Sequence, residues 1–87
     1  MNDSSDKTVA AAKKVADKLD QRGHKRHAGA LRAVLAEIHP RSMFLRALRE
    51  TCQTVLTAIE AVDPVCATLV EELRLEVDKR VREEHSS

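Results

Sequence analysis

The stretch that decides the fold is LRALRETCQTVLTAIEAVDPVCATLVEEL, residues 45–73. As far as Val62, its apolar side chains recur at alternating spacings of three and four, the pattern by which amphipathic helices pack against one another. The residues of this seam are Leu45, Leu48, Cys52, Val55, Ile59, Val62, Leu69 and Leu73. The seam predicts either a packed core or a surface for self-association.

Asp63-Pro64 interrupts this stretch. Aspartate is a favoured N-cap residue, and proline is tolerated at the first position of a helix, so the pair predicts the start of a new helix. The seam nevertheless continues in phase through Pro64 to Leu73. One long helix kinked at Pro64 is therefore the alternative to two separate helices.

Two shorter helices are expected upstream, over residues 6–22 and 24–38. In each, apolar positions step by three, four and three: Val9, Ala12, Ala16 and Leu19, then Ala28, Leu31, Leu35 and Ile38. Gly23 suits the left-handed residue that closes a helix, and Pro40 disfavours helical geometry at His39 before it. The short loop predicts an antiparallel helical hairpin.

The fold class is therefore all-α, a small bundle of about four helices at residues 6–22, 24–38, 42–62 and 64–82. Ser42 is expected to cap the third helix, and Phe44, the one aromatic residue, is expected in the core. Residues 6–83 are expected to form a single helical domain, between a disordered N-terminus at 1–5 and a loose tail at 84–87. A chain of 87 residues buries a small core, so we expect it to form a homodimer.

The composition also bears on location. No apolar run approaches the roughly 20 residues that a membrane span requires, and the opening MNDSSDK lacks the layout of a secretory signal. We expect a cytoplasmic protein with reduced thiols and no membrane contact.

Charge is distributed unevenly along the chain. Residues 1–50 carry eleven Lys/Arg against six Asp/Glu, and residues 51–87 carry four against eight. This asymmetry indicates either a basic face for an acidic partner or two halves that attract each other.

The basic residues crowd into DQRGHKRHAGALR, residues 20–32. Candidate contacts to phosphate or to an acidic partner are Arg22, Lys25, Arg26 and Arg32. A solvated corner of the hairpin is the favoured interpretation, because no aromatic residue lies nearby to stack on bases. Gly23 and Gly29 do not form a phosphate-binding loop, since no Gly-Lys-Ser/Thr follows. We expect Gly29 to let two helices approach closely.

No catalytic, cofactor or metal site is expected. His24 and His27 share a helical face, but further ligands would have to come from His39, Cys52, Cys66, His85 or scattered carboxylates, at spacings typical of no zinc site. Both cysteines lie on the apolar seams, where a thiol behaves as a small apolar side chain, and they are too far apart along the helices to bridge. The pairs Glu71-Glu72 and Glu83-Glu84 indicate a solvated face, because adjacent helical residues point in different directions.

The segment VAAAKKVADKLDQRGHKRHAGALRAVL, residues 9–35, resembles the helical hairpin near the N-terminus of some bacterial AAA-type ATPases. The positions that carry the resemblance are Arg22, Gly23, His24, Ala28, Leu31 and Arg32. The phosphate loop and Walker B strand of those ATPases are missing from this chain. The resemblance implies an adaptor hairpin that docks a protein, and it implies no enzymatic activity.

Three functions are compatible with this sequence. The favoured hypothesis is a non-enzymatic protein-interaction module, a dimeric helical adaptor or inhibitor that binds a partner protein of unknown identity. The first alternative is a small nucleic-acid-binding regulator that uses the basic corner, whose affinity would fall steeply with salt. The second is a structural subunit of a larger assembly.

Overall fold

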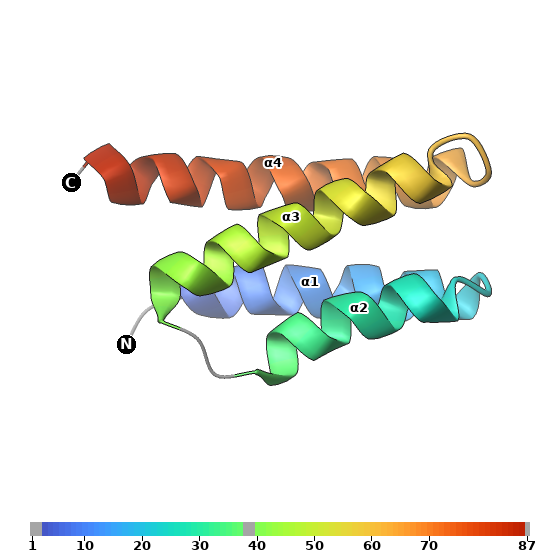
Figure 1. Ribbon diagram of the computed structural model, residues 1–87, viewed down its shortest axis with the longest axis horizontal. Coiled ribbons are helices and arrows are strands. Elements are labelled where there is room, and N and C mark those ends of the chain that lie inside the picture. The colour runs from blue at the N-terminus through green and yellow to red at the C-terminus, as the bar shows by residue number, and fades with distance from the viewer. Residues whose placement is uncertain (1–2, 38–39, 87) are drawn as a thin grey trace.

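The computed structural model describes residues 3–37 and 40–86 and shows four helices. They are α1 (Asp3–Gln21), α2 (Lys25–Ala36), α3 (Arg41–Ile59) and α4 (Pro64–Ser86) (Figure 1). The prediction of a small all-α bundle is confirmed. None of the described helices is both long enough and apolar enough to cross a membrane.

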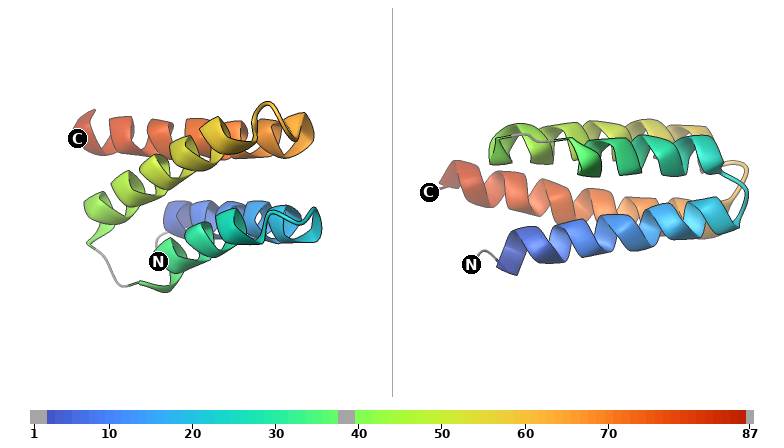
Figure 2. Two further views of the ribbon diagram at one scale, coloured as in Figure 1. Left: turned by 45° about the vertical axis from the view of Figure 1, so that its right-hand side comes forward. Right: turned by 90° about the horizontal axis from the view of Figure 1, so that it is seen from below.

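The four helices are arranged so that each packs on two others. α1 packs against α2 and α4, and α3 packs against α4 and α2. The α1–α2 turn and the α3–α4 turn lie together at one end of the bundle (Figures 1 and 2). The end of α2, the start of α3 and the described ends of the chain lie at the other end. This arrangement brings Arg22 and His24 of the first turn into contact with Asp63 of the second.

The core is formed by apolar side chains from all four helices. Its members are Ala12, Val15, Ala16, Leu19, Ala28, Leu31, Leu45, Leu48, Cys52, Val55, Ile59, Cys66, Ala67, Val70, Leu73 and Val77. Phe44 is partly buried against this cluster, which agrees with its expected place. Burial of apolar area drives the packing, since the helices contribute complementary stripes to one continuous interior.

The seam of residues 45–73 is used inside this core. Six of its members are at most 4% exposed: Leu45, Leu48, Cys52, Val55, Ile59 and Leu73. Leu69 is partly buried against the cluster, whereas Val62 lies in the α3–α4 turn and is 73% exposed. The seam therefore packs α3 against its neighbours within one chain.

The structure decides the alternative at Pro64 in favour of two helices, because α3 ends at Ile59 and α4 begins at Pro64. Other boundaries differ from the sequence prediction. α3 begins at Arg41 directly after Pro40, so Ser42 lies inside the helix and is not its cap. α1 starts at Asp3 and α4 runs to Ser86, so helix extends into both expected loose ends. Ile38 and His39 lie outside the described residues.

Candidate functional site

The α1–α2 turn is built around Gly23, which has a positive φ of 90°. Its N–H donates to the carbonyl of Asp20 at 3.1 Å, and the N–H of His24 donates to that of Leu19 at 2.8 Å. These two bonds form the Schellman arrangement that satisfies the last carbonyls of a helix. The expected role of Gly23 is confirmed, and the turn directs His24 towards the α3–α4 turn.

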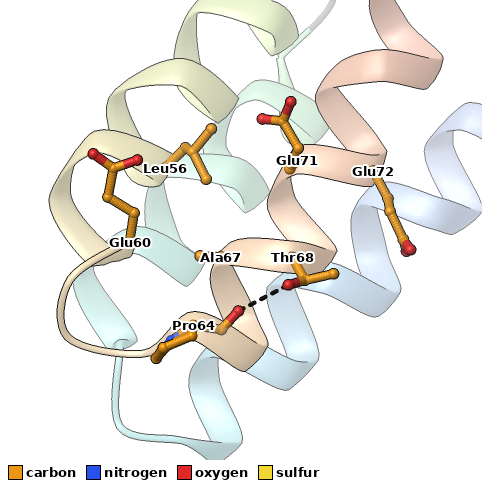
Figure 3. A pocket seen from close by; sticks show the side chains of 7 residues that line it. All are labelled: Leu56, Glu60, Pro64, Ala67, Thr68, Glu71 and Glu72. Atoms are coloured by element: carbon orange, nitrogen blue, oxygen red, sulfur yellow. Dashed lines mark hydrogen bonds between the residues drawn. The ribbon is translucent and has the colours of Figure 1, made fainter.

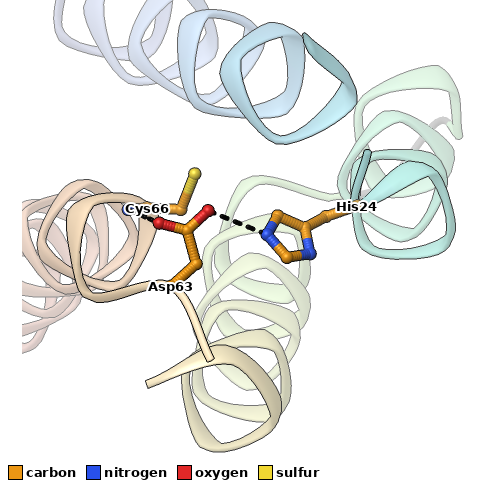
Figure 4. A group of neighbouring side chains, drawn as sticks. All are labelled: His24, Asp63 and Cys66. Carbon is orange, nitrogen blue, oxygen red and sulfur yellow. Dashed lines mark hydrogen bonds and ion pairs between the residues drawn. The ribbon is translucent and has the colours of Figure 1, made fainter. Parts of the chain in front are cut away.

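The α3–α4 turn is built around Asp63. The N–H of Cys66 donates to Oδ1 of Asp63 at 3.3 Å, so the carboxylate caps α4 as the sequence predicted. The other oxygen, Oδ2, accepts a hydrogen bond from Nε of Arg22 at 2.6 Å. It is also hydrogen-bonded to Nε2 of His24 at 2.9 Å (Figure 4). We name Arg22, His24 and Asp63 the clasp, because they join the two turns.

Burial and charge define the clasp. The side chain of Asp63 is 6% exposed, while those of Arg22 and His24 are 43% and 18% exposed. The hydrogen bond from Arg22, followed by that from His24, holds the pKa of Asp63 well below its ordinary value, against the opposing effect of burial. Asp63 raises the pKa of Arg22 in turn. The carboxylate is therefore ionised at neutral pH and paired with a guanidinium.

Both cysteines are free and lie in the core. Burial raises the pKa of the Cys52 thiol to about 12, and burial also raises that of Cys66, assisted by a hydrogen bond with Asp63. The nucleophilic and metal-binding form of cysteine is the thiolate, which these shifts disfavour. The Cys52 thiol therefore acts as an apolar core side chain, and the Cys66 thiol stays protonated beside Asp63.

His24, Asp63 and Cys66 can each offer one metal-ligating atom, and these atoms lie within 4.8 Å of one another. This group differs from the His24–His27 pair considered from the sequence, whose ring centroids are 6.4 Å apart. Two features oppose a cation here. The positive guanidinium of Arg22 already occupies Oδ2 of Asp63, and the Cys66 thiol is held protonated. The group fits a hydrogen-bonded clasp better than a metal site.

The basic corner is largely neutralised by carboxylates. Besides Arg22, Lys25 pairs with Asp20 at 2.9 Å, and Arg32 pairs with Asp17 at 2.8 Å and with Asp20 at 3.2 Å. Hydrogen bonds from Lys25 and Arg32 lower the pKa of Asp20. Arg26 is exposed. Three of the four cations predicted to contact phosphate or an acidic partner are thus paired within the chain.

A second feature of this end of the bundle is an open groove of about 430 Å³ between α3 and α4 (Figure 3). Its lining residues are Leu56 and Glu60 from the end of α3, with Pro64, Ala67, Thr68, Glu71 and Glu72 from α4. Leu56 and Ala67 form an apolar floor on the core, and the three glutamates supply negative charge. The sequence predicts only a solvated face at Glu71-Glu72 and carries no signal for this groove, which forms where α3 and α4 meet.

Two large exposed apolar side chains lie on α4 next to residues that line the groove. Val65 is 55% exposed and Leu75 is 50% exposed. Residues seven apart share a helical face, so Val65 lies two turns before Glu72 on the same face of α4. By the same spacing, Leu75 lies two turns after Thr68. We name the groove together with Val65 and Leu75 the acidic face. Val65 and Leu75 add exposed apolar surface beside the carboxylates of the groove, where a partner could contact it.

No family model, curated protein or solved structure matches this chain. The clasp, the basic corner and the acidic face are therefore the features of the molecule that bear on its function.

Proposed function

We propose that the protein is a non-enzymatic interaction module, a helical adaptor or inhibitor that binds a partner protein through the acidic face. The observation that carries this proposal is the exposure of Val65 and Leu75 beside an apolar-floored groove, in a chain whose other apolar residues are mostly in the core. Interfaces of this kind have an apolar centre and a polar rim. The proposal places the protein in the cytoplasm, where its two thiols would stay reduced.

Nucleic-acid binding is the weaker alternative. Arg22, Lys25 and Arg32 would have to leave Asp63, Asp20 and Asp17 before they could contact phosphates. Breaking each ion pair lowers the free energy gained from the new phosphate contact, because the carboxylate that is left behind loses its counter-charge. The negative acidic face at the same end of the bundle would also repel a polyanion.

The proposal does not assign a homodimer interface to the apolar seam of α3. Leu48 and Ile59 are buried in the core, so a second copy cannot use them without opening the fold. A homodimer would have to use exposed apolar residues such as Val62, Val65 and Leu75. Light scattering over a range of protein concentrations measures whether it forms.

The test is affinity capture from native lysate, with and without nuclease, using wild type, two matched apolar-to-charged variants and the basic-corner variant Lys25→Glu/Arg26→Glu. Val65→Asp/Leu75→Asp places charge on the acidic face, whereas Met43→Asp places it on a residue that is 58% exposed near the start of α3. All these positions are exposed, so the variants should keep their helicity. We expect a stoichiometric partner protein that is retained by Met43→Asp and lost by Val65→Asp/Leu75→Asp. Captured material that disappears with nuclease, or with Lys25→Glu/Arg26→Glu, would refute the proposal.

A further inference from the structure

The acidic face has the length and shape to take a helix. From Pro64 to Leu75 the backbone of α4 rises about 16 Å at 1.5 Å per residue, which corresponds to about three turns of a bound helix. The groove between α3 and α4 runs beside it, and its floor includes the small side chain of Ala67, which is 8% exposed. A small residue at the centre lets a partner backbone approach, and Leu56 beside it is available to contact the apolar side chains of the partner.

The carboxylates of the groove indicate which charge a bound helix should carry. Glu71 is already neutralised by Arg74, whose Nη2 donates to it at 2.6 Å and whose Nε donates at 3.1 Å. Glu60 and Glu72 are exposed, and no ion pair joins either of them to a cation elsewhere in residues 3–37 and 40–86. The hydroxyl of Thr68 donates to the carbonyl of Pro64 at 3.0 Å, so it is already used within the helix. The groove therefore presents two carboxylates without counter-charge on either side of an apolar floor.

From this charge and shape we infer that the acidic face receives a basic amphipathic helix from a partner protein. Apolar side chains of that helix would lie on Leu56 and Ala67, and its lysines or arginines would pair with Glu60 and Glu72. This inference rests on the proposed function and adds the chemical class of the partner. Helix-in-groove recognition reads such a ligand through apolar anchors three and four residues apart.

The test uses a fluorescein-labelled 18-residue peptide of leucine and lysine, with leucines at positions i, i+3, i+4 and i+7. Two controls are a scrambled peptide of the same composition without the apolar stripe, and a peptide with glutamate in place of lysine. Fluorescence anisotropy with the full chain should show saturable binding of the first peptide. The scrambled peptide should bind about tenfold more weakly because it cannot bury its leucines together. The glutamate peptide should not bind.

Matched variants locate the binding. Glu60→Gln and Glu72→Gln should each weaken the first peptide about two- to fivefold, the range for exposed ion pairs. Glu50→Gln, on a different side of α3, should leave its affinity unchanged. Thr68→Lys places a long cation in the groove and should abolish binding. Thr54→Lys is its control, because Thr54 is exposed and donates to a helix carbonyl in the same way, at 3.1 Å.

The outcomes separate this inference from the proposed function. If lysate capture depends on Val65 and Leu75 but the leucine-lysine peptide binds wild type and Thr68→Lys equally, the inference fails and the proposed function stands. If neither capture nor peptide binding depends on the acidic face, both fail. A dimer of the free protein that Thr68→Lys dissociates would make a second copy the occupant and would also overturn the inference.

Discussion

Nε of Arg22 donates a 2.6 Å hydrogen bond to Oδ2 of Asp63, which lies 41 positions further along the chain. This contact joins the first helical hairpin to the second at their shared end. His24 reaches the same oxygen, and the opposite oxygen of Asp63 caps α4. One carboxylate thus holds a helix start and two turns together, which makes the clasp the first target for stability measurements.

Asp63→Asn should lower Tm by several degrees at neutral pH and should flatten the acid dependence of stability. Because the folded-state pKa of Asp63 lies below its ordinary value of 3.8, its contribution is fully present above about pH 4 and is lost as the pH falls further. Urea unfolding between pH 7 and pH 2 measures this dependence. If wild type and Asp63→Asn lose stability in parallel across this range, the clasp does not control acid stability.

Arg22→Ala should lower Tm at neutral pH, because it removes the guanidinium that pairs with a carboxylate only 6% exposed. Arg26→Ala is the matched control, since Arg26 is an exposed arginine of the same corner. Thermal unfolding followed by circular dichroism compares the two. Equal Tm values for both variants would contradict the structural role given to Arg22.

The two glycines should respond to alanine in opposite directions. Gly23 has a φ of +90°, so Gly23→Ala should destabilise the protein by about 1–2 kcal/mol. Gly29 lies within α2, and a Cβ added there meets nothing within 4 Å, so Gly29→Ala should stabilise by about 0.5–1 kcal/mol. Urea denaturation measures both changes. A loss of stability in Gly29→Ala would indicate that Gly29 does lie at a close contact between helices, as the sequence suggested.

Leu48 and Val62 belong to the same seam but should differ sharply in their effect on folding. Leu48→Ala should cost about 2–5 kcal/mol because Leu48 is fully buried within the single chain. Val62→Ala should stay within about 0.5 kcal/mol, because Val62 is exposed in a turn. If Leu48→Ala does not fold, Ile59→Val, expected to cost about 0.5–1.5 kcal/mol, provides the milder core measurement. Leu48→Ala with wild-type stability would place Leu48 outside the core.

Cys52 and Cys66 should react with dithionitrobenzoate only after unfolding. Both side chains are fully buried, and burial raises the pKa of each thiol, to about 12 for Cys52. The time course of the reaction in increasing urea should follow the loss of helicity. Rapid reaction of either thiol in native buffer would show that it is accessible.

Most of the fold could be predicted from patterns among residues that are close together in the sequence. The apolar spacings placed four helices, Asp63-Pro64 marked a start, and Gly23 marked an end, because each depends on neighbours within one or two turns. Gly29 was wrongly expected at a close helix contact, although it directly follows the buried Ala28 and so points about 100° away from the core. Residue identity alone does not show which face of a helix a glycine occupies.

The clasp and the acidic face were missed for a different reason. Asp63 meets Arg22 only because the α1–α2 and α3–α4 turns share an end of the bundle, which depends on the packing of four helices and not on nearby residues. The groove likewise combines Leu56 and Glu60 of α3 with residues of α4. An up-and-down topology with short first and third connections would have supplied the missing information, since it places alternate turns side by side.

The positions of the two chain ends have a practical consequence. Asp3 and Ser86, the outermost described residues, lie at the end of the bundle opposite the α3–α4 turn (Figure 1). An affinity tag, a fluorophore or a sensor surface attached to either terminus would be separated from Glu60 and Pro64 by the length of the helices. Immobilised or displayed copies would therefore all present the α3–α4 turn outward, whichever terminus carried the attachment.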